Sequence, residues 1–397
     1  MEPKIRFSSS NILYEEKTLS EISTINPKTN VPLEFEYVDL ESVSGTEMTN
    51  HRTEHKATAP SRAQRLAKKG DIFYQTVRPY QKNNYYFDMD DDNYVFSTGY
   101  AQIRPSIYGK YLFTLLQNDS FLKQVLDNCA GTSFPAINPS VLSRLSVRIC
   151  KDKQEQQAIA SYFTSLDSQI SASTSRLASL KQMKAASLQA MFPQEGETVP
   201  KIRFKGFEGE WTWLKLGDIS EQVKRKAPIN STAPVMMISA LNGFINQSEK
   251  YSDNNAGSSL ANYTLLKKGE LSYNHGYSKT RNFGSCFNLL VEEARIPFVY
   301  HSFRLTNDND SFYAYYLNSG TKDKELKRLV SSTARMDGLL NISFKNYMEL
   351  SVPHPSLAEQ QAIANYFTSL DRQISLQSQR LEKLKQIKSA CLDKMFV

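Results

Sequence analysis

Apolar side chains recur at steps of four and three residues in two stretches of the sequence, which is the spacing of one face of an α-helix. In the first stretch the seam is interrupted once, at Ser173, and consists of Ile159, Phe163, Leu166, Ile170, Leu177 and Leu180. In the second stretch it consists of Ile363, Phe367, Leu370, Ile374, Leu381 and Leu384. Neither 151–192 nor 356–397 contains Gly or Pro, so each is predicted to form one long helix. A lone helix would expose such a seam, so each helix needs a partner.

The two helical stretches are near copies of each other. Residues 155–192 and 359–396 align without a gap at an offset of 204, and 25 of the 38 positions are identical. A helix of this length measures about 57 Å. A shorter repeat lies upstream, where the sequence PKIRF occurs at both 3–7 and 200–204. The chain therefore consists of two half-molecules in tandem, and we predict that the two helices pair with each other in antiparallel directions.

Outside the helices the pattern changes to short apolar runs separated by Gly and Asn, which is typical of strands joined by loops. Strand-like runs include Phe35–Leu40, Asp71–Val77, Tyr94–Phe96, Leu145–Ile149, Val235–Ile238, Leu271–Tyr273, Phe298–Leu305 and Leu350–Val352, and helical patterns cover Lys110–Asn128 and Ser311–Leu329. The predicted fold class is mixed α+β, with two globular α/β domains, a pair of long antiparallel coiled-coil helices and a pseudo-two-fold internal repeat. The predicted domains are a first globular domain at 1–150, a central helix at 151–192, a linker at 193–204, a second globular domain at 205–353 and a C-terminal helix at 354–397. Since the two globular parts align poorly, we expect one scaffold that presents two different surfaces.

Composition narrows the class of protein. The 397 residues include 48 Lys and Arg against 41 Asp and Glu, which gives a net charge of +7 and permits a polyanionic partner. No apolar stretch is long enough to span a membrane, and no apolar signal segment follows Met1. The four cysteines lie far apart and are expected to be reduced thiols. We therefore predict a cytoplasmic protein without contact to a membrane.

The sequence lacks the motifs of the common enzyme classes. It contains no phosphate-binding loop, no dinucleotide fingerprint and no Asn/Asp-Pro-Pro-aromatic tetrad of amino-methyltransferases. His51 and His55 are four residues apart but lack the H-E-x-x-H arrangement and a third ligand, so no metal site is predicted. The acidic run at 88–92 lacks the Gly and Glu that a calcium loop requires. We predict no catalytic residues and no cofactor for this chain.

Basic, aromatic and amide side chains cluster within both globular domains. Lys and Arg neutralise phosphates, and Arg, Asn and His can bond to base edges, so these clusters are candidates for DNA binding. In the first domain the candidates are Arg62, Arg65, Lys68, Lys69, Arg78, Tyr80 and Lys82. In the second they are Lys224, Arg225, Lys226, Asn274, His275, Tyr277, Lys279 and Arg281. Each cluster alone is also compatible with a solvated surface, and Arg78 before Pro79 could instead brace the end of a strand.

The duplicated helix closely resembles the specificity (S) subunits of type I restriction–modification systems. The resemblance rests on the Glu-Gln-Gln-x-Ile-Ala motifs at 155–160 and 359–364 and the Leu-Asp-x-Gln-Ile motifs at 166–170 and 370–374. Leu-Lys-Gln-x-Lys follows at 180–184 and 384–388, and further marks include Lys-Gly-Asp at 69–71, Lys-Gly-Glu at 268–270 and Gly-Thr at 131–132. The second domain has 332–338 (STARMDG) in place of a Gly-Thr before its final strand. The resemblance covers essentially the whole chain.

The resemblance implies a non-catalytic subunit that reads a bipartite double-stranded DNA site, with one target recognition domain for each half. It implies that the paired helices set the distance between the halves, about one turn of DNA or slightly less, and dock two methyltransferase (modification) subunits. Restriction (endonuclease and translocase) subunits would join them, and S-adenosylmethionine, ATP and magnesium would bind to those partners. Two alternatives remain at this point: a coiled-coil adaptor without DNA readout, and a nuclease or methyltransferase with an unrecognised site. The target bases do not follow from the sequence, because base readout depends on loop geometry and DNA shape.

Overall fold

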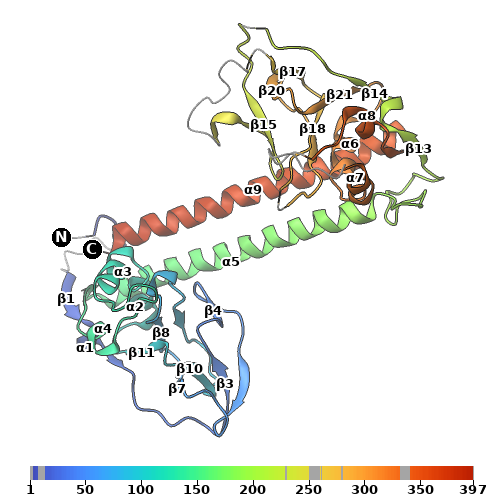
Figure 1. Ribbon diagram of the computed structural model, residues 1–397. Coiled ribbons are helices and arrows are strands. Elements are labelled where there is room, and N and C mark those ends of the chain that lie inside the picture. The colour runs from blue at the N-terminus through green and yellow to red at the C-terminus, as the bar shows by residue number, and fades with distance from the viewer. Residues whose placement is uncertain are drawn as a thin grey trace. The chain divides into compact units, whose positions relative to one another are not determined.

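A computed structural model describes residues 3–7, 14–228, 230–249, 260, 262–278, 280–330 and 340–396. The chain divides into two compact units (Figure 1). Unit 1 comprises Met1–Thr174 and Gln379–Val397, and unit 2 comprises Ser175–Ser378. Each unit therefore contains one globular part and a segment of both long helices, α5 (Lys153–Ala190) and α9 (Leu357–Met395).

Unit 1 contains two four-stranded sheets. The first is antiparallel, in the order β2 (Ser23–Ile25), β11 (Tyr100–Pro105), β8 (Ile72–Gln75) and β9 (Tyr85–Tyr86). The second has the order β6 (Arg52–His55), β3 (Glu34–Val38), β10 (Tyr94–Ser97) and β7 (Ala63–Leu66), with β3 and β10 parallel. Smaller elements are the pairs β1 (Tyr14–Thr18) with β12 (Ser146–Cys150) and β4 (Val43–Ser44) with β5 (Glu47–Met48), and the helices α1 (Leu19–Ile22), α2 (Gly109–Leu115), α3 (Asp119–Asp127) and α4 (Pro139–Leu142).

Unit 2 repeats the first of these sheets. Its order is β14 (Ser220–Gln222), β21 (His301–Leu305), β18 (Leu271–Asn274) and β19 (Ser285–Asn288), again antiparallel throughout. Three two-stranded pairs accompany it: β13 (Thr212–Lys215) with β22 (Ser351–His354), β15 (Met236–Ser239) with β16 (Gly243–Asn246), and β17 (Thr264–Lys267) with β20 (Glu293–Ile296). The helices are α6 (Asp310–Leu317), α7 (Asp323–Leu329) and α8 (Phe344–Met348). Strand β18 in unit 2 thus takes the place that β8 takes in unit 1.

The helices α5 and α9 pack in antiparallel directions within both units. In unit 1, Asp167 of α5 pairs with Lys388 of α9 at 2.5 Å, and the Tyr162 hydroxyl lies 3.5 Å from the Cys391 sulfur. In unit 2, Lys184 of α5 pairs with Asp371 of α9, also at 2.5 Å. Asp371 and Lys184 stand 204 positions from Asp167 and Lys388, so the two ion pairs are the same contact made twice. The prediction of a mixed fold with paired long helices is confirmed.

The seam side chains of both helices are largely covered. Eight of them are less than 10% exposed, namely Ile159, Phe163, Leu166, Leu180, Ile363, Phe367, Leu370 and Leu381. The other four, Ile170, Leu177, Ile374 and Leu384, are partly buried. In unit 1 the seam joins the core of the globular part together with Leu392, Met395 and Phe396 from the end of α9. Each fully buried apolar side chain of this size stabilises the fold by roughly 1.5–3 kcal/mol.

A short segment at the start of each repeat crosses both helices. In unit 1 the backbone amides of Lys4 and Ile5 donate to the Lys394 carbonyl at 2.8 and 3.2 Å, and Arg6 pairs with Glu155 at the start of α5. In unit 2 the Ile202 amide donates to the Ala190 carbonyl at 2.9 Å, and Arg203 pairs with Glu359 at the start of α9. These segments, Pro3–Phe7 and Pro200–Phe204, are called the clasps below. The repeated sequence PKIRF therefore joins the end of one long helix to the beginning of the other.

Each of the two predicted helical patterns contains two helices. The pattern at Lys110–Asn128 gives α2 and α3, because the Asn118 side chain accepts a hydrogen bond from the Ser120 amide at 2.6 Å and starts a new helix. The same side chain donates to the Leu392 carbonyl at 2.7 Å. The pattern at Ser311–Leu329 gives α6 and α7, which are separated at Gly320 with φ of 88°. Both stretches are therefore helical, with a break in each that the pattern did not indicate.

Among the described residues, no helix is apolar over a length that would cross a membrane. The four cysteines, all of which the structure describes, are free thiols.

Candidate nucleic-acid interface

The two predicted DNA-binding loops follow equivalent strands. In unit 1 the turn that contains Arg78, Tyr80 and Lys82 follows β8 directly. In unit 2 the loop that contains Asn274, His275, Tyr277 and Arg281 begins at the last residue of β18. Because β8 and β18 take the same place in equivalent sheets, the two loops occupy the same position within their own units. Their side chains differ, with Arg78 in unit 1 and Tyr277 in unit 2 both standing three residues after the strand.

The turn in unit 1 is locally strained. Arg78 and Lys82 both adopt the left-handed conformation, with φ of 54° and 53°, on either side of the 3-10 turn Pro79–Gln81. For a residue with a Cβ atom this conformation costs about 1–2 kcal/mol. Such backbone persists only where its surroundings hold it, and it concentrates at functional sites.

A buried amide network holds this turn. Gln75 is 1% exposed, and its side-chain nitrogen donates to the Val77 carbonyl at 2.7 Å and to the Gln81 side chain at 2.8 Å. Its side-chain oxygen accepts from the Asn83 amide at 3.1 Å, and its backbone amide donates to the Asn84 side chain at 2.8 Å. The turn is therefore fixed from the core of the sheet through the buried Gln75.

A second loop supports the turn from the other side. The Arg78 amide donates to the Pro135 carbonyl at 2.8 Å, and Val77 forms a bridge with Ala136. The Arg78 guanidinium lies over the ring of Phe134, 4.5 Å from its centre. Phe134 is 60% exposed and Tyr80 is 50% exposed. The half-buried Arg78 and the exposed Phe134 therefore join two adjoining loops, and Tyr80 is exposed on the same turn as Arg78.

Other predicted cations of unit 1 lie elsewhere or are engaged within the protein. The Lys82 ammonium donates to the Gln117 carbonyl at 3.1 Å and to the Asp119 carboxylate, which ties the turn to α3. Lys69 pairs with Asp90 at 2.6 Å. Arg62, Arg65 and Lys68 lie in or beside β7, on the second sheet. Burial lowers the pKa of the Arg65 guanidinium, whose Nε lacks a hydrogen-bond partner among the described residues.

The loop of unit 2 presents fewer free side chains than the sequence suggests. Tyr277 is 63% exposed, whereas Arg281 is partly buried near Asp323 of α7. Burial lowers the pKa of Arg281 although the Asp323 charge opposes this. The Asn274 side chain donates to the Ile238 carbonyl at 3.3 Å and accepts from the Gly276 amide at 3.0 Å. Lys279 lies outside the described residues.

His275 lies in the interior of unit 2. It is 5% exposed, and its ring nitrogens lie 2.7 Å from the Leu340 carbonyl oxygen and 3.0 Å from that of Val299. It stacks on His301, with ring centres 4.8 Å apart. Burial lowers the pKa of His301. His275 therefore braces the loop, and in this structure it has no free nitrogen to offer a base.

The basic run at 224–226 is partly structural. Arg225 donates to both carboxylate oxygens of Glu270 at 2.9 and 3.2 Å and to the Leu265 carbonyl at 2.9 Å. Glu270 has the role that Asp71 has in unit 1, where Arg104 donates to both carboxylate oxygens at 2.8 Å. Asp71 directly precedes β8 and Glu270 directly precedes β18, the strands that lead to the two loops. Each carboxylate also accepts a hydrogen bond from the backbone amide three residues earlier in the sequence. Lys224 and Lys226 are exposed.

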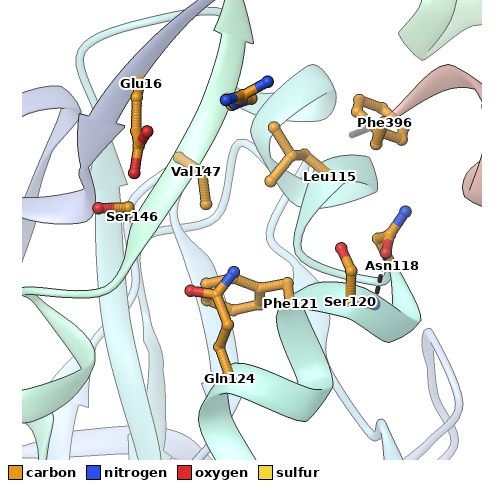
Figure 2. Close-up of a pocket in the computed structure, with 10 residues that line it drawn as sticks. Glu16, Leu115, Asn118, Ser120, Phe121, Gln124, Ser146, Val147 and Phe396 are labelled. Carbon is orange, nitrogen blue, oxygen red and sulfur yellow. Dashed lines mark hydrogen bonds between the residues drawn. The ribbon is translucent and has the colours of Figure 1, made fainter. Parts of the chain in front are cut away.

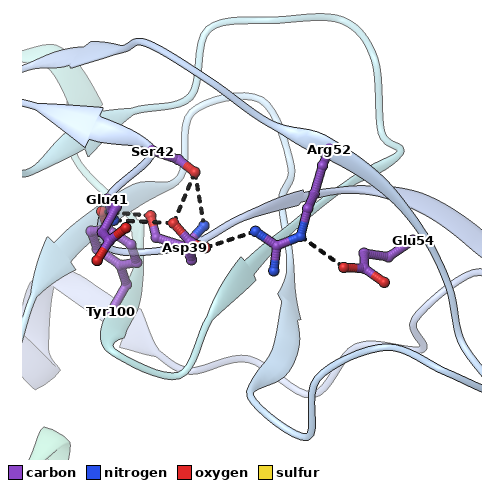
Figure 3. A network of polar contacts seen from close by, with 6 residues as sticks. All are labelled: Asp39, Glu41, Ser42, Arg52, Glu54 and Tyr100. Carbon is purple, nitrogen blue, oxygen red and sulfur yellow. Dashed lines mark hydrogen bonds and ion pairs between the residues drawn. The ribbon is translucent and has the colours of Figure 1, made fainter.

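Arg52, which lies between the two histidines of 51–55, is also neutralised (Figure 3). It donates to Asp39 at 2.9 Å and to Glu54 at 2.8 Å, and Ser42 donates to the same Asp39 carboxylate at 3.0 Å. Burial alone would raise the pKa of Asp39, but the hydrogen bonds from Arg52 and Ser42 hold it below its usual value. His51 and His55 pair with Glu36 at 2.7 Å and with Glu34 at 3.4 Å. Among the described residues, no group of three or more His, Cys, Asp or Glu side chains could hold a metal ion.

A pocket of 280 Å³ lies in unit 1, away from these loops in sequence (Figure 2). Its walls come from β1, β12, α2, α3 and the residue that follows α9, and they include Glu16, Phe121, Val147 and Phe396. None of its lining residues belongs to the Arg78 turn or to the Phe134 loop. It is therefore not part of the candidate interface.

Phe134 is the residue of this interface that the sequence did not single out. It is a lone aromatic side chain between Gly131, with φ of 88°, and Pro135. An exposed ring in a Gly- and Pro-bounded loop is a usable signal, but its contact with Arg78 spans 56 positions and depends on the fold.

Comparison with known proteins identifies the class. A family model of the type I restriction modification DNA specificity domain matches residues 11–182 and 208–386. The specificity subunit of the type I restriction enzyme HindI from Haemophilus influenzae is 34% identical over 139 residues. This match spans 34% of the present chain and 30% of that protein, which is less than a third of the relative's length.

Two solved structures share the fold. The S subunit of a type I restriction–modification system from M. genitalium aligns with a TM-score of 0.63 at 16% identity, over 100% of this chain and 99% of that chain. A chain from a structure of complex assembly and conformational transition of the type I R-M system aligns with a TM-score of 0.53 at 19% identity, over 98% of both chains. At these identities the likeness concerns the fold alone.

The fold and the duplicated match define a protein with two DNA specificity domains. The chain belongs to the type I restriction modification DNA specificity family, as a specificity subunit, the non-catalytic subunit of such a system. The resemblance drawn from the helix motifs is thereby confirmed.

Proposed function

We propose that this chain reads a bipartite, asymmetric DNA site, with unit 1 reading one half and unit 2 the other. The observation that carries this proposal is the pair of loops that follow the equivalent strands β8 and β18. Equivalent positions suit the same task, and different side chains at these positions suit different base sequences. The predicted DNA-binding residues stay predictions. At these two loops Tyr80 and Tyr277 are exposed and Arg78 is half-buried.

The helix pair has a separate proposed role. We propose that α5 and α9 set the gap between the two halves of the DNA site, because helices of 38 and 39 residues form a stiff spacer. Their exposed faces would dock two methyltransferase subunits, which restriction subunits would join. S-adenosylmethionine, ATP and magnesium would bind to these partners, and the cytoplasm is the compartment where all of them would meet DNA.

Mapping of methylated adenines tests the proposal. The chain is expressed with its methyltransferase partner in a host that lacks other adenine methylation, and the methylated positions are sequenced. The expected result is one two-part motif with a fixed gap. Methylation without a motif, or a motif with one part only, would contradict the proposal.

A binding experiment separates DNA readout from a purely scaffolding role. The assembled complex is titrated with a duplex that carries the mapped motif and with a scrambled duplex at several salt concentrations. Specific binding that weakens steeply with salt is expected for phosphate contacts. Equal affinity for both duplexes would favour a coiled-coil adaptor.

A further inference from the structure

We infer that Arg78 and Phe134 form one base-reading unit that selects a guanine in the half-site of unit 1, with Phe134 as a positioning residue that determines specificity through Arg78. This inference rests on the proposed function and names residues that would carry it out. Its first support is exposure. Phe134 is 60% exposed on a loop, although a large aromatic ring is normally covered in a stable fold.

The second support is the unfavourable backbone conformation of Arg78, which the fold holds in place. The backbone of Arg78 is held in the left-handed conformation by the Gln75 network and by the hydrogen bond to Pro135. A free arginine on a surface loop needs no such support. Here the backbone conformation sets the direction of the Cα–Cβ bond, and the adjoining loop supplies Phe134 as a platform for the guanidinium.

The third support is the chemistry of the pair. A guanidinium is planar and donates two parallel hydrogen bonds, which match the O6 and N7 acceptors of guanine in the major groove. An aromatic face at 4.5 Å attracts the cation and restricts its rotation, so less side-chain entropy is lost when the base is bound. A lysine or a flexible arginine would gain charge contacts but would select guanine less well.

Within its own turn, Arg78 is the cation that is not neutralised by a carboxylate of the described residues. Lys82 in the same turn is tied to Asp119, and in unit 2 Arg225 is neutralised by Glu270 and Arg281 lies near Asp323. Within the described part of the chain, Arg78 pairs with no carboxylate. Its charge is therefore available to an electronegative partner such as a guanine edge.

The test uses the assembled methyltransferase complex and duplexes in which each base pair of the mapped site is changed in turn. The variants are Arg78→Gly, which suits a left-handed backbone, Arg78→Lys, Phe134→Ala, Phe134→Leu and Phe134→Trp. Leu33→Ala is the matched control in unit 1, since Leu33 is 83% exposed and apolar. Thermal unfolding of each complex reports whether the variant still folds.

Arg78→Gly and Phe134→Ala are expected to lose roughly ten- to hundredfold discrimination at the same single G·C pair of the first half-site. Phe134→Trp should retain this discrimination, because it keeps an aromatic face, whereas Phe134→Leu and Arg78→Lys should not. The double variant should lose little more than either single variant, because the two side chains act together. In the Arg78 and Phe134 variants, discrimination at the second half-site should not change. In the Leu33→Ala control, discrimination at both half-sites should not change.

Three results would overturn the inference. Unchanged discrimination in Phe134→Ala, equal losses at all positions, or losses at different positions for the two residues would each do so. Failure of the wild-type complex to show a two-part motif would instead count against the proposed function, so the two failures are distinguishable. If Arg78→Gly fails to fold, the contrast between Phe134→Leu and Phe134→Trp still decides the question.

Discussion

At the scale of single residues, the buried carboxylates at the two clasps show how a side chain can join distant segments. Glu155 is 2% exposed and accepts from Arg6 at 2.7 and 3.1 Å and from the Cys150 thiol at 3.0 Å. Burial alone would raise the pKa of Glu155, but the Arg6 and Cys150 hydrogen bonds hold it below its usual value. Glu359 is 1% exposed and accepts from Arg203 at 2.6 and 2.7 Å and from the Trp211 indole at 3.1 Å. Each arginine therefore compensates a charge that the fold has removed from water.

Substitution of Arg203 by alanine tests the clasp of unit 2. The change leaves the Glu359 carboxylate buried without its cation, so the free energy of unfolding should fall by about 3–5 kcal/mol. Arg304→Ala is the control, because Arg304 and Glu221 are 58% and 57% exposed and such a pair contributes only about 0–1 kcal/mol. Urea unfolding monitored by hydrogen exchange measures the free energy of unfolding of both variants. Similar losses in the two variants would contradict the account of the clasp.

Gly284 offers a residue-scale test of the loop in unit 2. Its φ is 81°, and a Cβ atom there would lie 2.5 Å from the Asn274 carbonyl oxygen. Gly284→Ala should therefore destabilise unit 2 by more than 1 kcal/mol and weaken readout of the second half-site. Gly209→Ala is the control, because Gly209 has φ of 80° with no atom within 4 Å of the added Cβ. If both variants lose the same stability, backbone strain rather than the close contact explains the effect.

The candidate site was predictable from the sequence only in part. Residue type and clustering pointed to the loops around Arg78 and Tyr277, and these loops proved to follow equivalent strands. The same reasoning also selected His275 and Arg225, which the fold engages through the Leu340 carbonyl and the Glu270 carboxylate. Such partners are distant in sequence, so whether a cation is free depends on tertiary contacts that no local pattern encodes.

At the scale of elements, the long helices followed from the sequence because periodicity and the absence of Gly and Pro act locally. The break between α2 and α3 did not, since Asn118 ends one helix and begins another while its amide reaches the Leu392 carbonyl of α9. The strand order of the two equivalent sheets could not be predicted from the sequence either. Single strands such as β8 and β18 were recognisable, but their order depends on pairings between distant segments.

The spacer role of the helices can be tested by lengthening them. Insertion of one heptad after Thr174 and another after Ser378 keeps the seam on nearly the same face and adds about 10 Å to each helix. The gap in the methylated motif should then grow by about three base pairs, at roughly 3.4 Å per base pair. Insertion in one helix only should disrupt the pair and abolish methylation. An unchanged gap in the double insertion would contradict the spacer role.

At the scale of the whole molecule, each unit is completed by a helix segment from the other half of the sequence. Unit 1 uses the first part of α5 with the last part of α9, and unit 2 uses the first part of α9 with the last part of α5. Leu392, Met395 and Phe396 thus belong to the same core as Leu19 and Ile72. The sequence indicated the pairing of the helices but not this division, because the division depends on the contacts of both clasps and both cores.

Removal of residues 379–397 should therefore unfold unit 1. Three large apolar side chains leave the core of unit 1, a loss on the order of 5–10 kcal/mol, which is comparable to the stability of a whole domain. Hydrogen exchange should show loss of protection in β8 and β11, while β18 and β21 stay protected. Phe396→Ala should give a smaller loss of about 3–5 kcal/mol in the same strands. Loss of protection confined to unit 2 would contradict this division.

The shared helices also impose an order on folding during synthesis. All residues of unit 2, Ser175–Ser378, are translated before Gln379–Phe396. When the whole of unit 2 has been translated, unit 1 therefore still exposes the core surface that Leu392, Met395 and Phe396 later cover. Domains usually mature from the N-terminus onward, whereas here the N-terminal unit is completed last, and until then its open surface is a natural target for chaperones.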